Sequence, residues 1–498
     1  MRSAVAQFWL SHSSCSPGFR TYLQADWLIA LLRGPTLQPA DMSSNLRSTA
    51  RAWFRRIHSA HIAAGGLALF GVMLVQRPQS LAARDTDPTF AEDVAPILYK
   101  NCTSCHHTGG LGPFSLVEYD SAKANLNDIR DAVETAYMPP WHAAGAHGVF
   151  LNDRRLSETE KSTILRWIDA GAKPGDLKKL PPKPVYATKW EIGTPDAIVT
   201  MPEEFVVPAK GTIEYQYFEV PVNITEDRWV QAIEILPGAR DVVHHVLVYA
   251  RVPESAGGAA PAPRPAGTRA PPPLIVRNRL QGIPEDGRRA DSRNAPPRQM
   301  GALIGTTAPG TNTLVFPKGT ALRLRKGTVL TFQMHYTAHG HETKDRTSVG
   351  FRFANEMPDE EMFASAFFNG AFVLPAGAKD VEVPADIGVS QPIKVWALFP
   401  HTHVRGTRWE YTLQNPDGTS EMILDVPRYD FNWQTYYLFA KPLDIPVGAK
   451  IRSRAWYDNS ATNKHNPDAT KQVTWGDQTW EEMQYTGFLY TVPSRRLK

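Results

Sequence analysis

Residues 229–250 read WVQAIEILPGARDVVHHVLVYA. Two runs of β-branched and aromatic residues, 229–236 and 242–250, flank a segment with Pro, Gly and Asp, a pattern typical of strand, turn and strand. This pattern of short apolar runs separated by turn residues recurs through residues 190–495, and no long helical pattern interrupts it. We therefore predict two antiparallel, jelly-roll-like β-sandwiches, 190–354 and 355–495. The predicted strands are 215–222, 229–236, 242–250, 329–336, 349–353, 393–398 and 451–457.

The composition limits the class of protein. The chain has 498 residues, 42% of them hydrophobic and 21% charged, which argues against wholesale disorder and a polytopic membrane protein. The net charge of +4, from 54 basic and 50 acidic residues, gives no case for nucleic-acid binding. Three cysteines are too few for a disulfide scaffold, so packing must stabilise the chain.

The N-terminal part has the order of a secretory signal. Basic residues precede the apolar run 60–75, and the small-residue stretch 80–83 follows it. We predict that 1–41 is an upstream extension, that translation starts at Met42, and that 42–83 is a signal peptide or an uncleaved anchor. The rest of the chain is then exported to the periplasm or another extracytoplasmic space, and only an uncleaved anchor would contact a membrane. Cys15 would not belong to the mature protein.

Cys102-Thr103-Ser104-Cys105-His106 is the attachment pattern of a c-type haem. Two thiols three residues apart can add to the haem vinyl groups, and the adjacent imidazole can reach the iron. A zinc site would need a second pair of soft ligands, and no cysteine remains to supply it. A redox C-x-x-C pair would not explain His106. We therefore predict one covalently bound haem c.

Met138, in Tyr137-Met138-Pro139-Pro140-Trp141, is the candidate for the sixth iron ligand. A thioether raises the reduction potential and suits electron transfer. The alternative is a methionine of the core, which is the commoner role. His107 and His142 are weaker rivals.

A helix should close this region. Ser157 and Glu160 form a capping-box pattern, and Gly171 and Pro174 end the apolar periodicity. Residues 90–176 resemble the small class I cytochrome c domains of bacterial electron-transfer proteins. The matching residues are the C-x-x-C-H, Gly109-Gly110, Gly112-Pro113-Phe114 and Met138-Pro139-Pro140-Trp141. The predicted haem domain is 86–178, followed by the proline- and lysine-rich linker 179–189.

Histidines in the β regions have the spacing of metal ligands. His401 and His403 follow an apolar strand, and residues two apart on a strand face the same side. His244 and His245 are neighbours, so a shared metal needs a bulge or a strand end there. His335 ends another strand and is a candidate third ligand. Each feature alone is more often structural or exposed.

Met483 completes the candidate set of metal ligands. Imidazole with thioether favours copper because sulfur is soft, whereas zinc more often recruits Cys, Asp or Glu. His339 and His341 have H-x-H spacing too and are rival candidates for metal ligands.

Residues 253–300 are polar, with proline-rich tracts and several arginines. We interpret them as a mobile insert, with a docking surface as the less favoured alternative.

The order of these motifs resembles the type II copper, ascorbate-dependent monooxygenases, whose known members are peptidylglycine α-hydroxylating monooxygenase and dopamine β-monooxygenase. The resemblance spans roughly residues 190–493. It implies two β-sandwich domains that each hold one copper across a solvent cleft. One copper stores an electron, and the other binds O₂ and a small organic substrate whose C–H bond is hydroxylated. By this resemblance His244, His245 and His335 hold the first copper, and His401, His403 and Met483 hold the second.

Two departures from that family matter. No cysteines remain for the disulfides of the animal enzymes, and Phe399 and Gly487 stand where the peptide-hydroxylating enzyme has an arginine and a tyrosine. A C-terminal glycine peptide is therefore a disfavoured substrate. Aromatic residues could suit an aromatic or apolar molecule, although core packing is the commoner role for them; they are Phe399, Phe431, Trp433 and Tyr485.

Three functional hypotheses follow. In the first, an exported monooxygenase takes electrons from ascorbate, from another external donor or from the fused haem. In the second, the chain is a non-catalytic copper and haem protein of a periplasmic electron chain. The third, a zinc hydrolase, is disfavoured because the sequence has no H-E-x-x-H motif.

Overall fold

The computed structural model describes residues 87–146, 148–187, 189–252, 301–307, 313–493 and 497. All of them belong to one compact unit, Thr86–Lys498. The predicted extension 1–41 with Cys15, the predicted signal 42–83 with Met42, and the predicted insert 253–300 lie outside the described residues.

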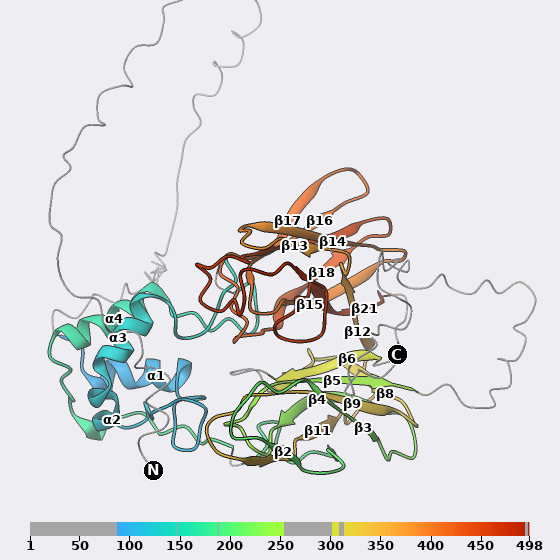
Figure 1. Cartoon of the computed structure of the whole chain (residues 1–498). Helices are drawn as coiled ribbons and strands as arrows, with labels where there is room; N and C mark the ends of the chain where they lie inside the picture. The colour runs from blue at the N-terminus through green and yellow to red at the C-terminus, as the bar shows by residue number, and fades with distance from the viewer. Residues whose placement is uncertain are drawn as a thin grey trace, which may run out of the picture. The chain divides into compact units, whose positions relative to one another are not determined.

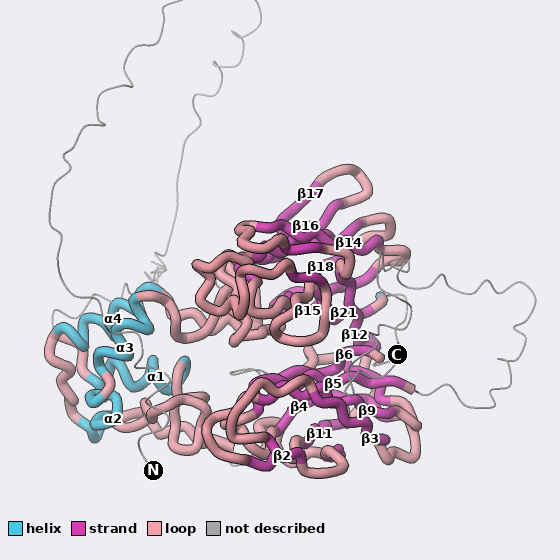
Figure 2. Tube along the Cα trace, in the orientation of Figure 1, coloured by secondary structure: helices cyan, strands magenta, loops and turns pink. Residues whose placement is uncertain are grey.

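Helices gather in the first part of the described chain, where Figure 2 colours them cyan. The predicted capping box is confirmed: Glu160 N–H donates to Ser157 Oγ at 3.2 Å, and Ser157 N–H donates to Glu160 Oε2 at 2.8 Å. Among the described residues, no helix is both long and apolar enough to cross a membrane. The helical elements are a π-helical turn (Phe90–Val94), α1 (Ala95–Asn101), α2 (Tyr119–Ala124), α3 (Leu126–Glu134), α4 (Glu158–Asp169) and a 3-10 turn (Leu177–Lys179).

The rest of the described chain is mostly β-sheet (Figure 1). All seven predicted strands are confirmed, and they correspond to β3, β4, β5, β9, β11, β15 and β19. The strands are β1 (Ala197–Thr200), β2 (Phe205–Val207), β3 (Gln216–Pro221), β4 (Arg228–Leu236), β5 (Val243–Arg251), β6 (Ala302–Thr307), β7 (Thr313–Val315), β8 (Thr320–Leu324), β9 (Val329–Tyr336), β10 (Thr343–Asp345), β11 (Ser348–Phe353), β12 (Glu360–Phe368), β13 (Val373–Leu374), β14 (Val381–Gly388), β15 (Ile393–His401), β16 (Gly406–Gln414), β17 (Ser420–Val426), β18 (Tyr437–Ile445), β19 (Lys450–Tyr457), β20 (Val473–Thr474) and β21 (Tyr485–Thr491).

The strands form several sheets. The largest, of nine strands, has the order β1-β11-β4-β8-β12-β21-β15-β18, with β7 beside β4. Two four-stranded sheets have the orders β3-β9-β5-β6 and β14-β19-β16-β17. Strand β12 joins the two parts of the large sheet, because its first residues pair with β8 and its later ones with β21.

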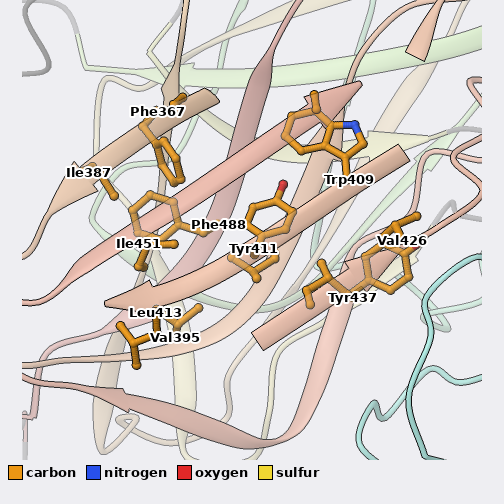
Figure 3. Close-up of a cluster of buried hydrophobic side chains, with 14 of the residues drawn as sticks. Phe367, Ile387, Val395, Trp409, Tyr411, Leu413, Val426, Tyr437, Ile451 and Phe488 are labelled. Atoms are coloured by element: carbon orange, nitrogen blue, oxygen red, sulfur yellow. The ribbon is translucent and has the colours of Figure 1, made fainter. Parts of the chain in front are cut away.

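Two hydrophobic cores hold these sheets together. One takes buried side chains from β4 and β11 of the large sheet and from β5 and β9 of a four-stranded sheet. The other lies between β15 and β21 of the large sheet and the strands β16 and β19, and it includes Trp409, Tyr411 and Phe488 (Figure 3). Each core is therefore built by facing sheets, as alternating strand patterns require.

The segment after α3 is attached to the second core. Trp141 is buried there, with its ring 5.2 Å from that of Tyr437. Leu151 N–H donates to Leu438 O at 2.7 Å, and Phe150 pairs with Phe439 as an isolated bridge. This segment directly follows Met138, so the candidate haem loop is held against the β part of the chain.

Candidate functional site

Three histidines meet where β5 lies beside β9. The register of this pair shifts between Val243 and His245, and His245 then stands opposite His335. This bulge meets the condition derived from the sequence, because it lets the adjacent side chains of His244 and His245 turn to one side. His245 Nδ1 lies 2.9 Å from His244 Nδ1 and 3.3 Å from His335 Nδ1. We call these three residues the first set.

The outer nitrogens of His244 and His245 indicate the tautomers of these two rings. His244 Nε2–H donates to Asn432 Oδ1 at 3.2 Å, so the Nδ1 lone pair of His244 is free. Gln434 Nε2–H donates to His245 Nε2 at 3.2 Å, which leaves the ring proton of His245 on Nδ1. That proton lies between the neighbouring Nδ1 atoms. If this proton moves to Nε2, three Nδ1 lone pairs converge, and a metal ion fits between them.

Burial lowers the pKa of all three rings of the first set. For His245 and His335 the pKa falls well below the ordinary value, with repulsion from neighbouring rings as a further cause. The rings are therefore neutral at physiological pH, the form that binds metals.

The second set is His401, His403 and Met483. His401 is the last residue of β15, and its Nδ1–H donates to Gln434 Oε1 at 2.8 Å. His403 Nδ1–H donates to Glu481 O at 3.1 Å. With both Nδ1 atoms donating, both Nε2 atoms keep a free lone pair. Burial lowers the pKa of His401 to about 4 and that of His403 to about 3.

One nitrogen of the second set is buried without a hydrogen-bond partner. Within the described part of the chain, His403 Nε2 is buried without a hydrogen bond. His401, His403 and Met483 all line one cavity of about 500 Å³. Two imidazoles and a thioether that line the same cavity could hold a metal ion and leave it open to the cavity.

Glu482 positions this second set, and the residue patterns did not single it out as a structural anchor. Its buried carboxylate accepts backbone N–H bonds from His403 at 2.8 Å, Arg405 at 2.7 Å and Met483 at 3.2 Å. His403 and Met483 come from distant parts of the sequence, and this one side chain bonds to the backbone of both. Burial raises the pKa of Glu482 to about 7.

The cavity has an aromatic wall. Asp477 is a carboxylate in its lining, and burial raises the pKa of that side chain to about 6. Of the aromatic residues picked from the sequence, Tyr485 lines the cavity, whereas Phe399 is fully buried and stacks on Tyr436. The aromatic lining residues are Tyr215, Tyr249, Phe368, Trp475 and Tyr485.

The segment Asp430–Gln434 lies between the two sets. Gln434 hydrogen-bonds to His245 on one side and His401 on the other. The Phe431 ring lies 4.8 Å from that of His245 and 5.9 Å from that of His403. The family resemblance implies a solvent cleft between the sets, whereas here these side chains occupy the space.

The C-x-x-C-H segment follows α1 directly. Cys102 and Cys105 are free, half-buried thiols, and burial raises the pKa of Cys102 to about 12. His106 Nδ1–H donates to Phe114 O at 3.1 Å, so Nε2 is free to bind a metal. A Cβ on Gly112 would come within 2.5 Å of the His106 ring, so only glycine leaves room for this ring. These features fit a haem iron ligand.

The candidates for the sixth iron ligand differ in their surroundings. Met138 N–H donates to Ala132 O at 3.1 Å, which holds the methionine at the end of α3. His107 stacks on Tyr186, with ring centroids 3.9 Å apart. His142 lines a cavity of about 540 Å³ that also includes Phe431 and Asn432 of the segment between the histidine sets.

His339 and His341 belong to neither set. With Asp241 they form a separate group whose potential ligand atoms all lie within 4.8 Å of one another. Their rival claim to the main sites is therefore not supported by their position.

Comparisons with known proteins give no family. No family model matches the chain, and no curated protein is similar to it in sequence. Among solved structures, the major capsid protein P2 from bacteriophage PM2 is similar at 9% identity and a TM-score of 0.24, over 60% of this chain and 98% of the capsid protein. Infectious bursal disease virus Gx strain is similar at 10% identity and a TM-score of 0.17, over 61% of this chain and 74% of the other. Likeness at these TM-scores supports no conclusion about function.

Proposed function

We propose that this chain is an exported copper-dependent monooxygenase that uses O₂ to hydroxylate a C–H bond of a small organic molecule. In this proposal, two jelly-roll-like β-sandwich domains, 190–354 and 355–495, carry one copper each, and a cytochrome c-like domain, 86–178, precedes them. The observation that carries the proposal is the pair of chemically different ligand sets, each with a buried histidine. One is closed and all-imidazole, and the other contains a thioether and lines a cavity.

The donor atoms favour copper over zinc. His401, His403 and Met483 would hold one ion, and soft sulfur favours Cu(I). The first set would hold the other through its three Nδ1 atoms. When bound, copper supplies one-electron redox chemistry and activation of O₂, which the side chains alone lack.

The residues around the second set orient its ligands. Glu482 fixes the backbone of His403 and Met483, and Glu481 O fixes the ring of His403. The aromatic wall favours an apolar or aromatic substrate. Asp477 can accept a hydrogen bond from a polar group of that substrate.

The haem would be bound by Cys102, Cys105 and His106, with Met138 as the sixth ligand. A covalently held haem supplies electrons one at a time. The route to copper would start at Tyr137, which is next to Met138 in the sequence. The phenol of Tyr137 hydrogen-bonds to Trp433, and burial and the charge of Asp430 raise its pKa. In the same segment, Asn432 bonds to His244 of the first set. Electrons would therefore reach the first set through Asp430–Gln434.

The hydroxylation is tested by incubating the copper-loaded full chain with ascorbate, ¹⁸O₂ and a panel of apolar and aromatic small molecules. We expect mass spectrometry to find a product that carries ¹⁸O, and Met483→Ile to abolish it. The matched control is Met422→Ile, because Met422 is exposed on β17. If no panel member is oxidised while both copper sites are filled, the proposal loses its support.

The electron route is tested by flash reduction of the haem without O₂. We expect the reduced haem to be reoxidised only when the first set holds Cu(II), and to stay reduced in the metal-free chain. Reoxidation that is equal with and without copper would contradict the route.

A second candidate is a non-catalytic copper and haem electron-transfer protein. The close packing of the two sets around Gln434 favours it, because closed sites suit electron transfer. The cavity beside Met483 discriminates between the two, since electron transfer needs no substrate space. Haem reoxidation without any oxygenated product would favour this candidate.

A further inference from the structure

A third group of ligand atoms lies apart from both sets, at the end of the β5–β9 ladder. His339 Nε2 is 2.6 Å from Asp241 Oδ2, and the rings of His339 and His341 have centroids 3.9 Å apart. One atom from each side chain lies within 4.8 Å of the other two. We call these three residues the clamp group.

The backbone holds this arrangement in place. Gly340, between the two histidines, has φ of +101°, a conformation that only glycine adopts without strain. Gly340 N–H donates to Ala209 O at 2.9 Å, which anchors the turn from outside. This turn brings the side chains of His339 and His341 together.

The carboxylate side of the clamp group is also fixed. Thr337 N–H donates to Val242 O at 2.8 Å, so the chain after β9 stays beside the chain before β5. Ala239 N–H donates to Asp345 Oδ1 at 2.8 Å, which fixes the turn that carries Asp241. The three side chains therefore start from two anchored segments, and binding an ion requires little ordering of the backbone.

We propose that the clamp group is a third metal site, which takes a borderline divalent ion of the Zn²⁺ type. Two imidazoles and one carboxylate suit zinc and related transition metals, whereas Mg²⁺ and Ca²⁺ prefer oxygen ligands alone. Asp241 and His341 are exposed, so the site is open to solvent and keeps positions for water.

The clamp site joins the two strands that carry the first set. Asp241 precedes His244 by three residues, and His339 follows His335 by four. Each of these separations spans about 10 Å or more when the chain is extended. An ion at the clamp group cross-links these two segments outside the hydrogen-bonded ladder. It stabilises the strand ends that present the first set, without itself taking part in the chemistry proposed for that set.

The site is tested with Zn²⁺ alone on the full chain, after removal of metals with a chelator. Equilibrium dialysis followed by elemental analysis gives the bound equivalents. We expect His339→Ala/His341→Ala to bind one equivalent fewer than the wild type, and Asp241→Asn to bind the same ion at least about tenfold more weakly. The matched control is His465→Ala, which removes an exposed histidine elsewhere and should leave the count unchanged.

A second double variant separates this proposal from that of the copper sites. His244→Ala/His335→Ala removes the first set, and we expect it to retain the equivalent that depends on His339 and His341. Zn²⁺ should also raise the melting temperature of the wild type more than that of His339→Ala/His341→Ala. An unchanged count in the His339→Ala/His341→Ala variant would overturn the clamp site, and so would its loss in the His244→Ala/His335→Ala variant.

Discussion

The two histidine sets differ in which nitrogen they offer and in what surrounds them. The first set turns its Nδ1 atoms inward, between β5 and β9. Its outer nitrogens hydrogen-bond to Asn432, Gln434 and Thr479. The second set keeps its Nε2 atoms free, adds the thioether of Met483, and lines a cavity. A closed set suits an ion that only exchanges electrons, whereas an open set suits one that meets a substrate.

Gln434 hydrogen-bonds to both sets, and one orientation of its amide cannot leave the proposed ligand nitrogen free in both. Its amide has one donor end and one acceptor end. As placed, its oxygen accepts from His401 Nδ1–H and leaves Nε2 of His401 free. Its nitrogen donates to His245 and puts the proton of that ring on Nδ1. With the amide turned around, His245 Nδ1 would be free and His401 Nε2 protonated. Either orientation prepares one set and opposes the other.

The largest expected effect is the loss of the first site in His245→Ala. His245 Nδ1 is the atom between the other two, and loss of an outer hydrogen-bond partner alone costs about 10- to 100-fold in metal affinity. We therefore expect the affinity of the first set for copper to fall more than about 100-fold. Anaerobic titration with Cu(I) against a competing chelator measures both sites. Equal weakening of both would show that the sets are one site, and His465→Ala is the control.

Met483→Ile should weaken the second site selectively. Removing the soft sulfur should lower the affinity for Cu(I) at least about tenfold and affect Cu(II) less, since imidazole serves Cu(II) well. The same titration in both oxidation states measures the effect, with Met422→Ile as the exposed control. A loss that is equal for Cu(I) and Cu(II) would argue against a thioether ligand.

Gln434→Leu should sharpen the comparison by uncoupling the sets. We expect the wild type to bind its second copper more weakly than its first, because the two ions require opposite orientations of the amide. In Gln434→Leu this difference should disappear, while each site loses about tenfold in affinity with its outer partner. Asn432→Ala is the matched variant, because Asn432 bonds to His244 and should weaken the first site alone. Unchanged coupling in Gln434→Leu would remove Gln434 from this role.

The smallest effect concerns the pH dependence of the metal-free chain. Burial lowers the pKa of His401 to about 4 and of His403 to about 3, from the ordinary value of 6.5. As the pH falls below 6.5, the unfolded chain binds protons that the folded chain refuses, so the free energy of unfolding falls between 6.5 and about 4. Glu482 and Asp477, whose pKa values are raised, act in the opposite direction.

A comparison of variants isolates the histidine contribution to that pH dependence. The melting temperature of the metal-free wild type should fall more between about pH 7 and about pH 5 than that of His401→Gln/His403→Gln. An equal fall in both proteins would show that these histidines are not kept neutral by the fold.

Much of the β part could be predicted from the sequence, because strands leave a local signature. The run 329–336 coincides with β9, and the bulge needed by His244 and His245 lies at the start of β5. The cytochrome-like and monooxygenase-like interpretations rest on motifs and remain proposals.

Other features could not be predicted, because they depend on contacts between distant residues. Nothing local in the sequence shows that the Glu482 carboxylate is buried against the backbone of His403, or that Gln434 reaches two histidines. The grouping of His339 and His341 with Asp241 likewise depends on the turn at Gly340 and on contacts between distant segments. Local patterns indicate which residues can be ligands, and tertiary packing decides how they are grouped.

The central claim is that two different copper sites exist and that only one of them contains sulfur. X-ray absorption at the copper edge of the fully Cu(I)-loaded chain tests it most directly, with the copper content measured on the same sample. We predict two coppers for each chain and one copper–sulfur contact for each pair, with the sulfur signal absent from Met483→Ile. A wild-type spectrum without sulfur, or one whose sulfur signal persists in Met483→Ile, would contradict the account.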